Sequence, residues 1–206
     1  MGNRVNITVY SDYLCPWCYI AAVRLQKIEE EYGERVCVTW KSFPLILGEI
    51  IGHDRRAHMA HSWLRAGEEE GSIRYNLWPE SSPLPTSSLP AQEAAKCAAL
   101  QGEEAFKRFH MLLLRAFFEQ NRDISSRDVL ISISQEAQLD MERFNSDFDS
   151  RSQREKVLAD YREGKNDTGF TGVPTAIFGD QFALEGAVPI EMYRRAVDVL
   201  LKKEKH

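Results

Sequence analysis

The stretch Cys15-Pro16-Trp17-Cys18 joins two patterns of different period, and its position between them decides the fold. Before it, apolar residues alternate with other residues over positions 5–10, which predicts a β-strand. After it, apolar residues recur at helical spacing as far as Gly33, which is typical of a helix and its C-terminal stop. Pro16 suits the first turn of that helix, where a missing N–H leaves no hydrogen bond unmade. The cysteine pair therefore lies at the start of a helix that follows a strand.

The remaining elements fall into three regions of different kind. Residues 35–43 are rich in β-branched and aromatic side chains and predict a second strand, which pairs in parallel with the first. Residues 52–163 show helical patterns and no convincing strand, and they contain a proline- and serine-rich loop over residues 79–90. Near the C-terminus, the Gly179-Asp180 turn predicts a hairpin, and a final amphipathic helix follows it.

This order of elements predicts an α/β fold of the form βαβ…ββα with an inserted all-helical domain. We expect residues 1–48 and 165–206 to form the α/β domain, and residues 49–164 to form the helical insertion. Within the insertion we expect four or five helices, the last of which runs unbroken over residues 140–163.

Composition and charge narrow the range of partners. The 206 residues include 26 basic and 31 acidic side chains, and the net charge of −5 disfavours nucleic acid as a partner. The chain has no apolar run of signal-peptide length and none of about 18 residues, so we expect neither secretion nor a membrane span. We therefore expect a cytoplasmic protein without a nucleic-acid or membrane partner.

The paired cysteines can carry redox chemistry. A thiol reacts as its thiolate, and the unpaired N–H groups at a helix N-terminus favour a negative charge on Cys15. Cys18 lies one turn further on, within reach to form a disulfide with Cys15. Cys15 would then be the nucleophile and Cys18 the resolving thiol. Two buried inert thiols or half of a metal site are the alternatives, but no second close pair completes a zinc site, and we expect no metal.

The other two cysteines, Cys37 and Cys97, stand alone in a strand-like stretch and in an alanine-rich helical stretch. Both are interpreted as buried inert thiols, because a free cysteine packs as a small hydrophobic side chain. An accessory redox pair is the alternative, and it requires Cα atoms within about 7 Å of each other.

A second motif, Gly172-Val173-Pro174-Thr175, immediately precedes the predicted hairpin. A proline at the first position of a strand is compatible with either a cis or an ordinary trans peptide bond. A cis bond would turn the backbone groups of Val173 toward the cysteine pair, where a substrate chain could bind to them. Trp17, between the cysteines, is expected to contact substrate or the helical insertion rather than pack in the sheet core.

Together the two motifs resemble those of the thioredoxin superfamily, and the helical insertion resembles its DsbA-like branch. Within that branch the chain is similar to the FrnE-like cytosolic dithiol–disulfide oxidoreductases. The shared features are the run from Asp12 to Tyr19, a second strand that ends in a phenylalanine (here Phe43) and the Gly-Val-Pro-Thr loop. The resemblance covers essentially the whole chain. It is specific at residues 11–20 and 169–186 and topological across the helical middle.

The resemblance implies a thioredoxin fold with Cys15 as an exposed nucleophile, Cys18 as the resolving thiol and Pro174 as a cis-proline beside them. It implies a thiol–disulfide oxidoreductase or isomerase that acts on a protein or small-molecule disulfide. The substrate-binding residues would be Pro16, Trp17, Val173 and Pro174. The redox-active cysteine pair would need no further cofactor, and glutathione or a thioredoxin system would recycle it. Relatives also suggest a homodimer formed through the helical insertion.

Members of the same branch without dithiol chemistry supply an alternative. The kappa-class glutathione transferases and the 2-hydroxychromene-2-carboxylate isomerases characteristically have serine where this chain has Cys15, and they activate glutathione. A glutathione-dependent isomerase or transferase of this kind, acting on a small aromatic substrate, would keep its activity without Cys18. A peptide-binding chaperone with incidental cysteines is a further alternative, and it would keep its activity without either cysteine.

Overall fold

The structure, a computed structural model, describes residues 4–48, 55–166, 169 and 171–203. The chain divides into an α/β unit (Met1–Phe43 and Tyr161–His206) and a helical unit (Pro44–Asp160). The domain boundary predicted between residues 48 and 49 adjoins residues 49–54, which lie outside the described residues. The predicted domain limits therefore stay a prediction.

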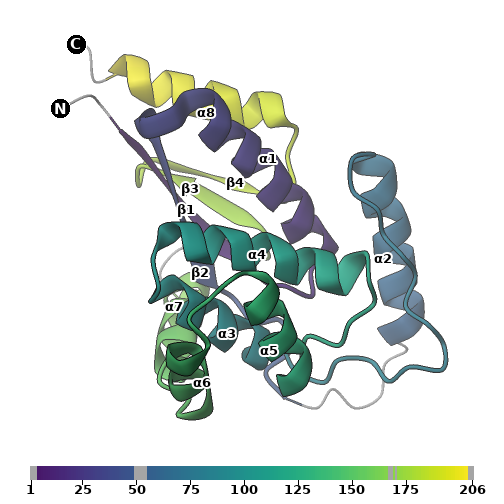
Figure 1. Cartoon of the computed structure of the whole chain (residues 1–206). Coiled ribbons are helices and arrows are strands. Elements are labelled where there is room, and N and C mark those ends of the chain that lie inside the picture. The colour runs from purple at the N-terminus through teal and green to yellow at the C-terminus, as the bar shows by residue number, and fades with distance from the viewer. Residues whose placement is uncertain (1–3, 49–54, 167–168, 170, 204–206) are drawn as a thin grey trace. The chain divides into compact units, whose positions relative to one another are not determined.

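The α/β unit is built on a four-stranded sheet with the strand order β2-β1-β3-β4 (Figure 1). Its strands are β1 (Val5–Ser11), β2 (Val36–Ser42), β3 (Thr175–Phe178) and β4 (Phe182–Glu185). β1 and β2 pair in parallel over their whole length, as predicted, whereas β3 pairs antiparallel with both β1 and β4. At the predicted hairpin turn, Gly179 and Asp180 both have positive φ, 49° and 55°, as a tight hairpin requires.

Two helices cover the sheet of the α/β unit. α1 (Pro16–Tyr32) and α8 (Ile190–Lys203) contact each other and lie side by side along the sheet (Figure 1). The short helix η1 (Gly33–Arg35) joins α1 to β2. Strand alternation turns Ile7 and Val9 inward, where they are fully buried with Leu25 of α1 and Val197 of α8. Because only residues 12–15 separate β1 from α1, the helix begins at the C-terminal end of β1.

Among the residues that the structure describes, the helical unit contains helices and no strand. They are α2 (Arg55–Glu69), α3 (Leu89–Ala99), α4 (Glu103–Phe118), α5 (Arg127–Glu136), α6 (Met141–Asp149) and the first part of α7 (Arg154–Asn166). The predicted βαβ…ββα order with an inserted helical segment is thereby confirmed. None of the described helices is long and apolar enough to cross a membrane.

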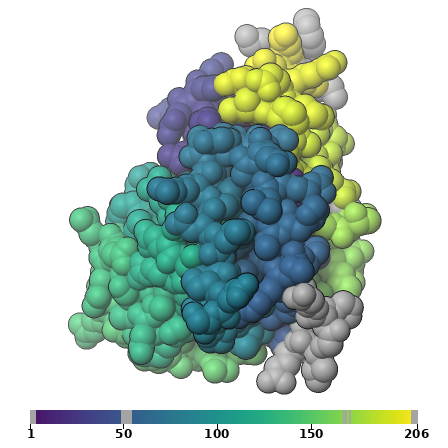
Figure 2. Space-filling model, turned by 90° about the vertical axis from the view of Figure 1, so that its right-hand side faces the viewer, coloured from purple at the N-terminus to yellow at the C-terminus, as the bar shows by residue number. Residues whose placement is uncertain are grey.

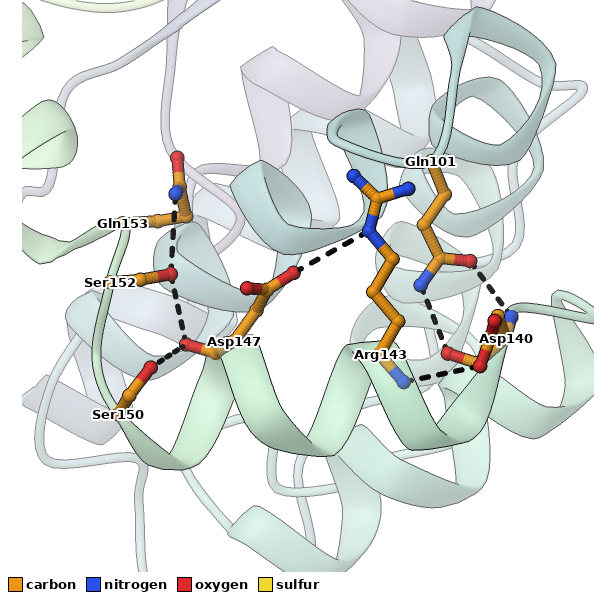
Figure 3. Close-up of polar contacts among 7 residues, drawn as sticks. All are labelled: Gln101, Asp140, Arg143, Asp147, Ser150, Ser152 and Gln153. Atoms are coloured by element: carbon orange, nitrogen blue, oxygen red, sulfur yellow. Dashed lines mark hydrogen bonds and ion pairs between the residues drawn. The ribbon is translucent and has the colours of Figure 1, made fainter.

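One predicted helix of the helical unit is wrong. Its apolar spacing predicts an unbroken helix over residues 140–163, whereas the structure has α6 and α7 separated by a turn over residues 150–153. In this turn Arg151 has a φ of 53°. The hydroxyls of Ser150 and Ser152 each donate to the Asp147 carbonyl at 3.1 Å (Figure 3). Serine hydroxyls that bond to nearby backbone compete with helical hydrogen bonds, which the spacing of apolar residues does not reveal.

Aromatic side chains form much of the core of the helical unit. The ring of Trp63, which is 1% exposed, packs edge-on against Phe117 and Phe118 with centroid distances of 5.3 and 5.1 Å. At the surface of this unit, α2 lies along the proline-rich loop that precedes α3 (Figure 2), and Arg55 donates to the Pro85 carbonyl at 2.7 Å. The helical unit therefore has a hydrophobic core of its own.

Candidate active site

Cys15 is the N-cap residue of α1. Its backbone is extended (φ −93°, ψ 116°), and Pro16 is the first residue of the helix. The Cys15 N–H donates to the Asp12 carbonyl at 3.2 Å, and the Cys18 N–H donates to the Cys15 carbonyl at 3.0 Å. These two hydrogen bonds close the turn between β1 and α1. The first turn of α1 contains no acidic residue to offset the positive end of the helix dipole beside Cys15.

Cys18, one helical turn after Cys15, is fully buried. Its sulfur accepts a hydrogen bond from the Asp12 N–H at 3.4 Å. Burial raises the pKa of the Cys18 thiol well above its usual value. A hydrogen bond with the Cys15 side chain and the charge of Cys15 raise this pKa further. Hydrogen bonds from Asp12 and Ser11 offset part of the rise. Cys18 is therefore a protonated thiol at neutral pH, out of reach of solvent.

Asp12 holds the turn that carries the cysteines, a role that was not predicted for it from the sequence. It is fully buried, and its carboxylate accepts the Leu14 N–H at 2.7 Å. The neighbouring Tyr13 is also buried, and burial together with the charges of Asp12 and Cys18 raises the pKa of its phenol. An aspartate after a strand is an ordinary turn signal, so the only clue to Asp12 was its place in the family-like run.

The loop of residues 172–175 reaches the cysteines from the other end of the chain. The Val173–Pro174 peptide bond is cis, as the resemblance implies. The Cys15 thiol donates to the Val173 carbonyl at 3.6 Å, although the two residues are separated by 158 positions in the sequence. They meet because β3, which begins at Thr175, the last residue of this loop, pairs with β1, which ends directly before the cysteine turn.

The predicted site residues differ in exposure. Trp17 and Val173 are half-buried, whereas Pro16 and Pro174 are buried. Cys15 is only 6% exposed, so the expectation of an exposed nucleophile is wrong. Its thiol bonds to the Val173 carbonyl, a long-range contact that the motif spacing does not show.

Cys37 and Cys97 belong to other elements. Cys37 lies in β2 opposite Asn6 and is half-buried rather than buried. Cys97 is buried in α3, where burial, followed by the charges of Asp147 and Glu93, raises its pKa to about 12. All four cysteines are free thiols. Within the described part of the chain, no group of three or more His, Cys, Asp or Glu side chains is placed to hold a metal ion.

The sheet order and the position of the cysteine pair are those of a thioredoxin fold, in which a helix carrying Cys-x-x-Cys follows the central strand. The DSBA-like thioredoxin domain matches residues 6–198, and the chain belongs to this family. The resemblance to the DsbA-like branch and the predicted thioredoxin fold with a helical insertion are thus confirmed.

Known proteins similar to the chain include adapters and a reductase. The ClpXP adapter protein SpxH of Halalkalibacterium halodurans is 32% identical over 181 residues, covering 84% of this chain but only 58% of that protein. A crystal structure from Nitrosomonas europaea has a TM-score of 0.80 at 22% identity and covers 98% of this chain and 99% of that chain. The cytosolic disulfide reductase DsbM of Pseudomonas aeruginosa, also solved with GSH, has a TM-score of 0.72 at 22% identity and covers 97% of each chain. At these identities the two structures establish the fold alone.

Proposed function

We propose that the chain is a cytoplasmic thiol–disulfide oxidoreductase or isomerase that exchanges disulfides through Cys15 and Cys18. The observation that carries the proposal is the position of the Cys15 sulfur, at the start of α1 and 3.6 Å from the Val173 carbonyl. A backbone carbonyl within reach of the nucleophilic sulfur can bind an extended substrate chain by main-chain hydrogen bonds. The buried Cys18 supplies the second thiol one helical turn away.

The proposed exchange proceeds in two steps. The Cys15 thiolate attacks a substrate disulfide, forms a mixed disulfide and releases one substrate thiolate, which takes up a proton. Cys18 then loses its proton and attacks the Cys15 sulfur, so that the second substrate thiol leaves and the Cys15–Cys18 disulfide forms. Two electrons pass from the enzyme dithiol to the substrate, whose disulfide is reduced. A substrate dithiol that reduces the Cys15–Cys18 disulfide drives the same steps in reverse.

The raised pKa of Cys18 supports this order of steps. A buried, protonated thiol does not compete with Cys15 for the substrate. The charge of Cys15 and its hydrogen bond both contribute to the raised pKa of Cys18. Both are lost when Cys15 enters the mixed disulfide, so Cys18 ionises more easily at the moment when its thiolate is needed.

The neighbouring residues would hold the substrate. Val173 offers its backbone to an extended segment, and Pro174 shapes the backbone beside Cys15. Trp17 is half-buried and supplies an aromatic surface, while Pro16 sets the start of α1. These steps require no metal or nucleotide, and glutathione or a thioredoxin system would recycle the cysteine pair. The similarity to DsbM, which has been solved with GSH, supports glutathione for this role.

A mixed-disulfide trap tests the proposal. Incubated with glutathione disulfide, Cys18→Ser should accumulate a single glutathione adduct on Cys15, while the wild type should form the Cys15–Cys18 disulfide instead. Cys97→Ala is the matched control and should behave as the wild type. If Cys18→Ser carries no adduct at Cys15, the proposed mechanism fails. Turnover of a small aromatic substrate with glutathione that survives in Cys18→Ser would indicate a glutathione-dependent isomerase or transferase.

The 32% sequence identity with a ClpXP adapter protein favours a second candidate function, in which the chain binds a partner protein without disulfide exchange. A variant with both Cys15→Ser and Cys18→Ser separates the two functions. An adapter would keep its partner in a co-purification experiment, because such binding needs no thiol. An oxidoreductase would lose all disulfide exchange in the same variant.

A further inference from the structure

A cavity of about 590 Å³ opens within the helical unit, and all of its lining residues belong to that unit. Small-molecule sites typically have volumes of roughly 300–1,000 Å³, so the cavity is large enough for a ligand. Its walls come from the ends of α3, α5, α6 and α7 and from the loops that include Leu47 and Thr86. None of these residues takes part in the proposed disulfide exchange.

Three arginines face two acidic side chains in this cavity. Arg127 forms a two-point ion pair with Asp149, with N–O distances of 2.8 and 2.7 Å. Arg154 lies 3.4 Å from the buried carboxylate of Glu93, where burial raises the pKa of the carboxyl. Arg151 is exposed, and its charge, like that of Arg154, acts on the Glu93 carboxyl and lowers the pKa of that group in part. With three guanidinium groups and two carboxyl groups, the lining carries an excess of positive charge.

Three helices also begin at the cavity. Leu89, Arg127 and Arg154, the first residues of α3, α5 and α7, all line it. The N–H groups and the dipole at a helix N-terminus favour a negative charge. The N-cap residue of α5, Ser126, makes no side-chain capping hydrogen bond. The helix ends therefore add to the positive potential of the arginines, and only α6 presents its C-terminal end there.

A well-bonded turn sets the position of two of the arginines. Arg151 lies in the turn between α6 and α7, and Arg154 is the first residue after it. In this turn the hydroxyls of Ser150 and Ser152 donate to the Asp147 carbonyl at 3.1 Å (Figure 3). The Arg154 N–H donates to the Arg151 carbonyl at 3.0 Å, and the Arg151 N–H donates to the Phe148 carbonyl at 3.1 Å. Because this backbone is already ordered, a ligand that binds both guanidinium groups loses less free energy to ordering the chain.

The rest of the lining combines apolar and hydroxyl groups. Its apolar side chains include Leu47, Leu89 and Phe148, and its hydroxyl groups are those of Thr86, Ser87 and Ser125. We propose that this cavity binds a small organic anion, a carboxylate or phosphate group carried on an apolar body. The arginines and helix N-termini would hold the charged group, and the leucines and phenylalanine would contact the apolar body.

Calorimetric titration of the whole chain with phenyl phosphate, phenylacetate and the neutral benzyl alcohol tests this proposal. At least one of the two anions should bind saturably, and benzyl alcohol should bind at least about tenfold more weakly, because hydrogen bonds to charged groups are worth this much. Binding of one anion alone identifies phosphate or carboxylate as the preferred group. Arg151→Gln should weaken anion binding by about tenfold or more. Arg127→Gln should also weaken it, since the charge of Asp149 is then unbalanced.

Arg143→Gln is the matched control. Arg143 is an exposed arginine of α6 that pairs with Asp147 and does not line the cavity (Figure 3). This variant should bind the anions as tightly as the wild type, and thermal melting monitored by circular dichroism checks that all variants are folded. The proposal is overturned if neither anion binds saturably, if benzyl alcohol binds as tightly as the anions, or if Arg151→Gln binds them as well as Arg143→Gln.

Discussion

The cysteine site of the α/β unit and the cavity of the helical unit are assembled in different ways. The reactive groups of the cysteine site come from residues 15–18 and from one loop that strand pairing brings beside them. The charged groups of the cavity come from α3, α5, α6, α7 and the turn between the last two. A local motif can predict the first kind of site, whereas only the folded chain reveals the second.

One cysteine from each unit gives the largest expected contrast. Cys15→Ser should lower the rate of disulfide exchange at least about a thousandfold, because the nucleophile is lost. Cys97→Ala should leave that rate unchanged, since Cys97 is buried and its pKa is raised to about 12. The rate of reduction of a glutathionylated peptide measures both variants. An equal loss in the two would contradict the assignment of the chemistry to the α/β unit.

A buried ion pair gives the next largest effect, on the stability of the helical unit. Lys96 of α3 and Asp160 of α7 lie 2.5 Å apart, and their side chains are only 12% and 7% exposed. Lys96→Met should lower the free energy of unfolding by about 3–5 kcal/mol, because it leaves a buried carboxylate without this counter-charge. Urea denaturation measures the change.

Lys107→Met is the control for this prediction. Lys107 pairs with Glu103 on the surface of α4, with side chains 38% and 63% exposed. Exposed helix pairs contribute about 0.3–0.5 kcal/mol, so the free energy of unfolding should fall by no more than that. Equal losses in Lys96→Met and Lys107→Met would show that burial does not govern the pair between α3 and α7.

Measured over a single pH unit, the smallest effect is a pH dependence that distinguishes the two units. In the helical unit, burial lowers the pKa of His110 from 6.5 to about 3, so the folded chain keeps the imidazole neutral. The unfolded chain takes up a proton below pH 6.5. The free energy of unfolding should therefore fall as the pH drops from 6.5 toward 3, by at most about 1.4 kcal/mol per pH unit from this group.

His110→Gln should remove this contribution and flatten the acid limb of the stability curve, as measured by urea denaturation at a series of pH values. An acid limb of unchanged slope in His110→Gln would refute the assignment to His110.

At the alkaline end, the raised pKa of Cys18 acts in the opposite sense. Stability falls as the pH rises above the usual cysteine pKa, because the unfolded chain ionises first.

Much of the fold could be predicted from local patterns. The alternation in β1 and the helical spacing in α1 each lie within one element, so neither depends on the rest of the chain. The break between α6 and α7 could not be predicted, because it depends on hydrogen bonds from serine side chains to the Asp147 carbonyl. Such bonds leave no trace in the spacing of apolar residues.

The candidate site could be predicted in part for the same reason. Cys15 and Cys18 form a local motif, and the motif around Pro174 indicated the second half of the site. The burial of Cys15 and its bond to the Val173 carbonyl could not be predicted, since Cys15 and Val173 are 158 positions apart and meet only in the folded chain. The arginines of the cavity resemble ordinary surface charges in the sequence, because α5, the turn between α6 and α7, and α7 bring them together only in the folded chain.

A glutathione redox titration tests the central claim most directly. The wild-type chain is equilibrated with glutathione and glutathione disulfide at a series of ratios, and its free thiols are then counted and located by mass spectrometry. We predict a reversible loss of two hydrogen atoms that maps to Cys15 and Cys18, while Cys37 and Cys97 remain thiols. If no Cys15–Cys18 disulfide forms at any ratio, the chain is not a dithiol–disulfide oxidoreductase.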